Sequence, residues 1–221
     1  MFNKIQIKQM KSDFNNIIKK YFFSLIFITF FISLTLSYQG YIISNFFGLN
    51  KILPSIILPF IVQEIAPSFG GIILSMQLTT FIVARIKIMQ FRGELKTINT
   101  MGLKFHNIFS ISFIIIILIS FLILNIFSIF SSILSVYCIC YIKFNMSINQ
   151  YIQQICTSIS TIDFILSELK IAVFSLVTSF ISIFYGLRNT KKKSLLDINY
   201  SILTIIIIII IIDYIINNII N

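Results

Sequence analysis

The sequence predicts an all-α membrane protein with about five transmembrane helices, preceded by an amphipathic N-terminal helix at the membrane interface. Of its 221 residues, 57% are apolar and 11% are charged, and the mean hydropathy is +0.99. Seventeen basic and seven acidic residues are too few to cover a water-soluble protein of this size, so lipid supplies the outer environment. The basic residues fall in clusters between long apolar runs, which is typical of membrane topology and not of nucleic-acid binding.

The N-terminal segment, residues 1–20, is predicted to form an amphipathic helix lying in the interface. Five lysines alternate with apolar residues there, and Phe14, Ile17 and Ile18 recur at helical spacing. The segment lacks the pattern of a cleavable presequence. The first span, about 21–44, follows directly and contains no ionisable group other than tyrosine.

The second span, about 52–84, is unusually long and carries a single charge, Glu64. A straight helix over this stretch would measure roughly 50 Å, whereas the hydrocarbon core is roughly 30 Å thick. We therefore expect this segment to tilt, protrude or break. Pro59 and Pro67 lack an amide donor and are the candidate points for a break, which at membrane depth usually lines a cavity.

The remaining spans are predicted at about 107–142, 164–187 and 198–216, so that residues 21–221 form one membrane domain. Between the second and third spans, the segment at about 86–101 is basic with one apolar edge. It is predicted to be a surface helix, because the twenty residues from Arg85 to Lys104 would be long for a plain loop. Such a helix would suit the docking of a motor subunit.

Orientation follows from the distribution of Lys and Arg. Fourteen of the seventeen basic residues precede the first span or lie in the connectors after the second and fourth spans. With five alternating spans, all of these connectors fall on one side, which is then cytoplasmic or stromal and carries the N-terminus. The opposite side retains only Lys51, Lys143 and Lys170.

Glu64 is the most informative single residue. Ten residues of helix from Pro54 place its carboxylate about 15 Å deep, close to the bilayer centre, where an ionisable group is a functional hypothesis by default. The alternative is that Glu64 serves packing only. Asp213 lies within the fifth span and invites the same question. Asp163, Glu168 and Lys170 are expected instead to reach the outer interface.

The residue pattern does not indicate an enzyme. His106 has no acid near it in sequence, and no glycine-rich phosphate loop occurs, so we expect no catalysis, no cofactor and no metal in this chain. Cys138, Cys140 and Cys156 have no histidine nearby and are interpreted as unpaired small apolar residues.

Two motifs resemble the permeases of the MlaE type: Gln39-Gly40-Tyr41 after the first span and Gln63-Glu64-Ile65-Ala66-Pro67 in the second. Gly70-Gly71 begins the small-residue stretch that follows in that family. Other positions match the family pattern at Ala84, Met89, Leu95, Met101-Gly102 and, more loosely, Lys170 to Gly186 and Asp213-Tyr214. The sequence departs from the pattern at Ala84-Arg85 and Gly93-Glu94, where the family has Ala-Glu and Glu-Gln.

The resemblance implies a homodimeric permease of an ABC transporter that moves phospholipid-like molecules. It implies an ATPase partner, which would bind the ATP, on the cytoplasmic side, and an MCE-domain lipid-binding protein on the other. The substrate pathway would include Glu64, Pro67, Gly70, Gly71 and Asp213. Coupling to the ATPase would involve Met89, Gly93, Glu94, Leu95 and Met101.

Richness in Ile, Asn, Lys and Phe suggests an AT-rich genome, and the chain resembles the plastid-encoded members of this family. We expect a chloroplast inner envelope location, with a bacterial inner membrane as the alternative. Two other functions stay open. The chain could be a non-transporting membrane scaffold that has lost ATPase coupling at Arg85 and Gly93. A membrane-embedded enzyme would need paired acids or histidines converging from different helices.

Overall fold

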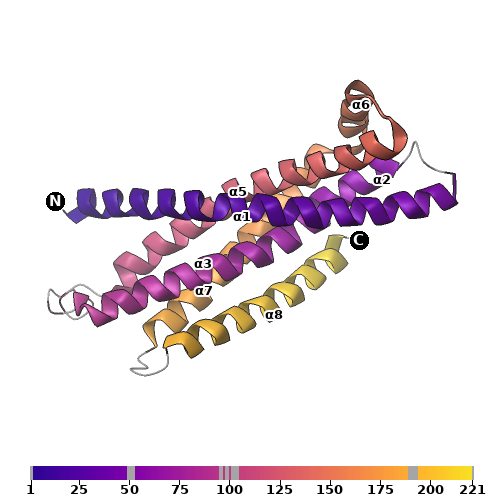
Figure 1. The fold of residues 1–221 in the computed structure, drawn as a ribbon. Coiled ribbons are helices and arrows are strands. Elements are labelled where there is room, and N and C mark those ends of the chain that lie inside the picture. Colours follow the sequence, from indigo (N-terminus) through magenta and orange to yellow (C-terminus); the bar gives the residue numbers. More distant parts are fainter. Residues whose placement is uncertain are drawn as a thin grey trace. The chain divides into compact units, whose positions relative to one another are not determined.

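The described part of the chain is almost entirely helical. The computed structural model describes residues 2–48, 53–94, 97, 100, 105–188 and 194–220, and no strand occurs within these ranges. The helices in chain order (Figure 1) are α1 (Phe2–Phe46), α2 (Leu53–Phe60), the π-helix η1 (Ile61–Ile65), α3 (Ala66–Phe91), α5 (Phe105–Phe144), α6 (Ile148–Ser158), α7 (Thr161–Leu187) and α8 (Ser194–Ile220).

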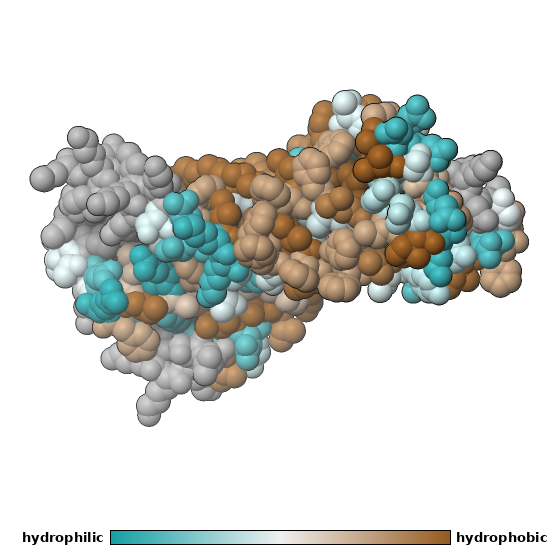
Figure 2. Space-filling view, turned by 45° about the horizontal axis from the view of Figure 1, so that its top comes forward, coloured by the Kyte–Doolittle hydropathy of each residue, from teal (hydrophilic) through white to brown (hydrophobic). Residues whose placement is uncertain are grey.

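Five helical stretches in the described part of the chain are long and apolar enough to cross a membrane, which confirms the predicted number of spans. They are Phe14–Phe46, Leu53–Phe91, Ile111–Phe144, Thr161–Leu187 and Leu196–Asn218. Large apolar side chains are widely exposed on these helices; Phe23, Phe31 and Phe184, for example, are each more than half exposed. Figure 2 shows hydrophobic residues over much of one face and hydrophilic residues gathered in patches. Such exposure is expected where lipid is the solvent.

The N-terminal helix and the first span are one element. α1 runs from Phe2 to Phe46 without interruption, so the boundary expected at residue 20 is not a helix boundary. The reason lies in the sequence, because neither Gly nor Pro occurs before Gly40. The apolar stretch of this helix begins at Phe14.

The second span contains a local change of helix type. α2 and α3 are joined by the π-helix η1, in which the amide of Ala66 donates to the carbonyl of Ile61, five residues earlier. Pro59 precedes this turn and Pro67 follows it. Short π-helical turns of this kind occur frequently at functional sites. The irregularity expected for this long segment is thus a π-helical turn within a helical stretch.

The chain forms two compact units, and several helices contribute to both. Unit 2 comprises residues 22–71 and 123–171. Its apolar core contains Leu58, Ile61 and Tyr151, from α2, η1 and α6. α6 begins with a capping box, in which Ser147 and Gln150 each satisfy the other's backbone amide through a side-chain oxygen.

The α1 and α5 segments of unit 2 meet along small polar side chains. Thr29 and Ser131 hydrogen bond at 2.7 Å between their hydroxyl oxygens. Buried serines follow one another along α5, at Ser128, Ser131, Ser132 and Ser135. Small hydroxyl residues allow membrane helices to approach closely and hydrogen bond across the interface.

Unit 1 comprises residues 1–21, 72–122 and 172–221. Within it, α3 and α7 contact each other closely. Thr79 and Ser182 hydrogen bond at 3.1 Å, and Gly186 faces Ile86 so tightly that an added Cβ would lie 2.7 Å from the Ile86 Cδ1 atom. All fourteen basic residues of the N-terminal segment and the two basic connectors belong to this unit by sequence.

Candidate functional site

The centre of the candidate site is an ion pair buried within the membrane-spanning helices of unit 2. The ammonium group of Lys170, on α7, lies 3.0 Å from the Oε1 atom of Glu64, in the π-helix η1. The Lys170 side chain is 2% exposed and that of Glu64 is 28% exposed. A lysine buried in hydrocarbon without a counter-charge would be costly. The pair therefore keeps two charges within the spans, and Glu64 is the partner that remains partly accessible.

Pro67 removes one backbone donor from the second span, and Lys170 of α7 binds the acceptor that this leaves. An α-helix would direct the amide of residue 67 to the carbonyl of Gln63, but proline has no amide hydrogen. The Lys170 ammonium donates to that Gln63 carbonyl oxygen at 3.1 Å. Lys170 thus interacts with both the charged side chain and the freed backbone acceptor of this segment.

Further polar side chains of unit 2 connect the same helices. The side-chain amide of Gln63 donates to the carboxylate of Asp163 at the start of α7. Asp163 is buried, and its second carboxylate oxygen accepts from the Ser160 amide at 2.7 Å. This carboxylate therefore caps the first turn of α7 and also binds the irregular second span, where a negative charge also complements the helix dipole.

A second group of polar contacts joins α5 to α7. The side-chain amide of Asn125 donates to Glu168 at 3.0 Å and to Ser167 at 3.2 Å. Asn125 and Ser167 are fully buried. We expected Asp163, Glu168 and Lys170 to reach the outer interface, and this expectation is wrong for two of them, because the side chains of Asp163 and Lys170 are buried against partners from η1.

The predicted pathway residues are divided between the two units. Glu64, Pro67, Gly70 and Gly71 follow one another along the second span in unit 2. An added Cβ at Gly70 would lie 3.4 Å from the Ser128 hydroxyl, so this glycine faces the serine-lined side of α5. Asp213 lies on α8 in unit 1 and is partly buried. Within the described residues, no group of three His, Cys, Asp or Glu side chains is placed to hold a metal ion.

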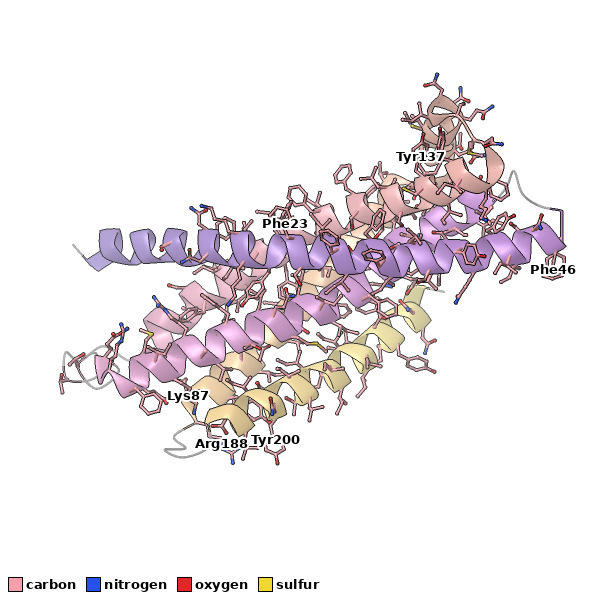
Figure 3. All side chains as sticks on the ribbon, viewed as in Figure 1. Phe23, Phe46, Lys87, Tyr137, Arg188 and Tyr200 are labelled. Atoms are coloured by element: carbon pink, nitrogen blue, oxygen red, sulfur yellow. The ribbon has the colours of Figure 1, made fainter. Side chains whose placement is uncertain are left out.

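A second buried lysine organises the basic end of unit 1. The Lys87 ammonium, on α3, donates to the Arg188 carbonyl just beyond α7 and forms an ion pair at 3.2 Å with Asp197, in the first turn of α8. The side-chain amide of Gln90 donates to the carbonyls of Gly186 and Leu187 at 3.1 and 3.3 Å. Figure 3 shows Lys87 and Arg188 at the same end of this unit. A cation at the C-terminus of α7 and an anion at the N-terminus of α8 both complement the helix dipoles.

The segment predicted to couple to an ATPase is divided by a turn. Residues 86–91, including the partly buried Met89, belong to α3. Gly93 then adopts a φ of 74°, the left-handed conformation common after a helix end, and its amide donates to the Gln90 carbonyl. Helical geometry resumes at Glu94, which pairs at 3.7 Å with Arg92. Leu95 and Met101 lie outside the described residues.

Several residues of the site were not selected from the sequence. They are Gln63, Asn125 and Lys170 in unit 2, together with Lys87 and Asp197 in unit 1. One signal for Lys170 was present, because a lysine and a glutamate in different apolar spans are natural partners. The contact itself joins positions 106 residues apart, so its existence depends on how the helices pack.

The fold and this site define a polytopic membrane protein that holds an ion pair within its spans. Such intramembrane charges are characteristic of transport proteins. The chain belongs to the MlaE permease family, because the family described as Permease MlaE matches residues 10–219. Permeases of this family are membrane subunits that work with an ATPase partner in ABC systems. A comparison with curated proteins finds no significant match.

Proposed function

We propose that this permease moves phospholipid-like molecules and that the region around Glu64 and Lys170 forms part of their pathway. The observation that supports this proposal is the buried ion pair at the π-helical turn of the second span. An apolar membrane interior with one localised charge pair suits a cargo that combines long apolar chains with a charged headgroup.

The pair offers a specific way to bind an anionic headgroup. A phosphate oxygen is a strong acceptor for an ammonium donor and would compete with the Glu64 carboxylate for Lys170. Glu64 is the more exposed member of the pair, so a headgroup would approach from its side. The Gln63 carbonyl would keep Lys170 in position during the exchange, since this contact uses a different donor hydrogen of the ammonium.

The proposed assembly is a homodimer with an ATPase on the basic side and an MCE-domain lipid-binding protein on the opposite side. ATP would be bound by the ATPase, with no cofactor in this chain. Met89, Gly93, Glu94, Leu95 and Met101 would lie at or near the ATPase contact. The positive charge of the connectors supports this orientation. We propose the inner envelope membrane of a plastid as the location, with a bacterial inner membrane as the alternative.

The competing function is a membrane scaffold that does not transport. It is favoured by the departures from the family pattern at Arg85 and Gly93. Purification of the complex in mild detergent, with mass spectrometry of its proteins and lipids, separates the two. A transporter is expected to retain a nucleotide-binding subunit and phospholipid. A complex that consistently lacks any nucleotide-binding subunit would favour the scaffold.

Transport itself is tested by ATP-dependent lipid transfer from vesicles containing the reconstituted complex. We expect Glu64→Gln to reduce the transfer rate at least several-fold, because the neutral amide cannot balance the Lys170 charge. Lys20→Gln, which removes an exposed charge outside the predicted coupling segment and away from the ion pair, is the control for variant handling. Unchanged transfer by a folded Glu64→Gln complex would exclude the ion pair from the pathway.

A further inference from the structure

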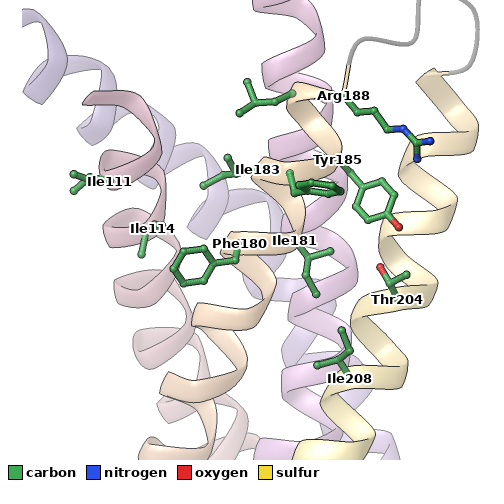
Figure 4. A pocket seen from close by; sticks show the side chains of 11 residues that line it. Ile111, Ile114, Phe180, Ile181, Ile183, Tyr185, Arg188, Thr204 and Ile208 are labelled. Atoms are coloured by element: carbon green, nitrogen blue, oxygen red, sulfur yellow. The ribbon is translucent and has the colours of Figure 1, made fainter. Parts of the chain in front are cut away.

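A large apolar groove lies in unit 1, separate from the ion pair. Its volume is about 1210 Å³. In Figure 4, α7 passes between α5 and α8, and the groove is lined by Ile111 and Ile114 from α5, by Phe180 and Ile181 from α7, and by Ile208 from α8. This volume exceeds the roughly 300–1,000 Å³ of ordinary small-molecule sites. A groove of this volume with a mainly apolar lining suits an acyl chain.

One end of the groove is polar and positively charged. Arg188, at the end of α7, is exposed and lines this end together with Tyr185 and Thr204. Figure 4 shows the hydroxyl groups of Tyr185 and Thr204 pointing toward each other between α7 and α8. An arginine guanidinium matches the geometry of a phosphate group, and neighbouring hydroxyls can add hydrogen bonds.

The backbone at this end is fixed by contacts already described. The Arg188 carbonyl accepts from the buried Lys87 ammonium, while Gln90 binds the carbonyls of the two preceding residues. The Arg188 side chain is therefore carried by an ordered helix end. The end also belongs to the basic side of the membrane by the distribution of Lys and Arg, where anionic lipids are attracted.

We propose that this groove binds an anionic phospholipid from the leaflet on the basic side of the membrane. The phosphate contacts Arg188 and Tyr185, and an acyl chain lies along Phe180, Ile181 and Ile208. The charge of Arg188 complements the headgroup, and basic pockets between membrane helices are recognised sites for such lipids. The site is distinct from the Glu64–Lys170 pair, so this proposal does not depend on which cargo the permease moves.

The absence of tryptophan from the sequence allows a direct test. Phe180→Trp places the only tryptophan of the chain in the groove, and Phe27→Trp places it on a helix outside the groove. The two phenylalanines are matched, because each is 62% exposed. Phe27 lies seven residues after Lys20, and Phe180 lies eight residues before Arg188. The full chain is reconstituted in phosphatidylcholine vesicles containing equal fractions of dibrominated phosphatidylglycerol or dibrominated phosphatidylcholine, whose bromines quench a nearby tryptophan.

We expect the tryptophan at position 180 to be quenched at about fivefold lower mole fraction of the anionic lipid than of the zwitterionic lipid, because a headgroup held in the groove adds a charge-assisted contact with Arg188 to the general attraction of the basic side. The tryptophan at position 27 should show no such preference. Equal quenching by both lipids at position 180 would overturn the proposal. So would weak quenching by either lipid, since a protein segment would then occupy the groove.

Arg188 variants test the headgroup contact. In the Phe180→Trp background, Arg188→Gln should abolish the preference for the anionic lipid, and Arg188→Lys should keep most of it. Lys20→Gln removes an exposed charge elsewhere and should leave the preference unchanged. Gel filtration and circular dichroism show whether each variant is folded. A preference that survives Arg188→Gln, or that is lost equally in Lys20→Gln, would contradict the assignment of the headgroup to Arg188.

Discussion

The two units differ in how they use charge. Unit 1 contains fourteen Lys and Arg and four acidic residues, whereas unit 2 contains three Lys and three acidic residues. By sequence, most of the basic residues in unit 1 lie outside the apolar stretches, a distribution that predicts one orientation in the membrane. The charges of unit 2 are few, and Glu64, Asp163, Glu168 and Lys170 are each in contact with a polar or charged group from another helix.

The same contrast appears in the two buried lysines. Lys87 binds helix ends, a carbonyl after α7 and a carboxylate at the start of α8. Lys170 binds the middle of a span, at a point where Pro67 has removed a backbone donor. One lysine therefore reinforces ordinary helix termini, and the other occupies an irregularity of the kind that accompanies function.

The largest effect is expected when the Lys170 contact is broken. Lys170→Met leaves the partly accessible Glu64 carboxylate within the span without its counter-charge and should lower the free energy of unfolding by about 3 kcal/mol. Thermal denaturation in mild detergent measures this change. Lys143→Met is the matched control in the same unit, because Lys143 is exposed and contacts only the faces of Tyr38 and Tyr41 among the described contacts. Equal losses in both variants would show that the buried pair has no special role.

The corresponding change in unit 1 should be smaller. Lys87→Met removes charged hydrogen bonds to Asp197 and to the Arg188 carbonyl, and we expect a loss of about 1.5–3 kcal/mol, because groups at helix ends recover contact with water. Arg92→Met, which breaks an exposed pair with Glu94, should cost less than about 1 kcal/mol. Denaturation of both variants under one condition compares them, and a Lys87→Met loss exceeding that of Lys170→Met would reverse the comparison.

Helix packing provides a third comparison between the units. Gly186→Ala would place a Cβ atom 2.7 Å from Ile86 Cδ1 and 3.1 Å from Ile86 Cβ, so we expect a loss of about 1–3 kcal/mol from overpacking in unit 1. Gly70→Ala in unit 2 meets its nearest atom at 3.4 Å and should be nearly neutral. Melting temperatures of the two variants test this order, which a more stable Gly186→Ala protein would contradict.

The smallest effect concerns Tyr151 on α6. Its hydroxyl donates to the Ile133 carbonyl at 2.7 Å, so Tyr151→Phe should cost about 1 kcal/mol at neutral pH. Burial raises the pKa of Tyr151. The unfolded chain therefore loses this proton near pH 10 while the native protein keeps it, and stability falls as the pH rises further. Denaturation above pH 10 should show a shallower decline for Tyr151→Phe, and identical slopes would contradict this role of Tyr151.

Much of the fold could be predicted from the sequence, because each membrane span depends on the summed hydropathy of many residues. The five spans arise from long apolar stretches, and the family resemblance is confirmed by the match over residues 10–219. Glu64 and Pro67 were also selected from the sequence, since a charge and a proline in an apolar run are each unusual there. Lys170 is also a charge in an apolar span, but the sequence predicted that its side chain would reach the outer interface.

The remaining features depend on contacts between distant parts of the chain. The Lys170–Glu64 and Lys87–Asp197 pairs join positions 106 and 110 residues apart, and no local pattern specifies them. The prediction of a surface helix over 86–101 did not consider Gly93. The left-handed backbone of this residue follows the end of α3. Continuity of α1 was missed for the opposite reason, because a change from polar to apolar composition does not interrupt a helix that lacks Gly and Pro.

The central prediction is that the five spans alternate across the membrane and that the basic connectors lie on the side where an ATPase would bind. One labelling experiment tests it. Cys156 is exposed on α6, and the exposed Thr97 lies before α5, so a single membrane span separates the two positions. Membrane-impermeant maleimide is applied to sealed vesicles of known orientation carrying either native Cys156 or Thr97→Cys in a Cys156→Ser background. We predict labelling from opposite faces, with Thr97→Cys on the ATPase side; labelling of both positions from the same face would contradict the account.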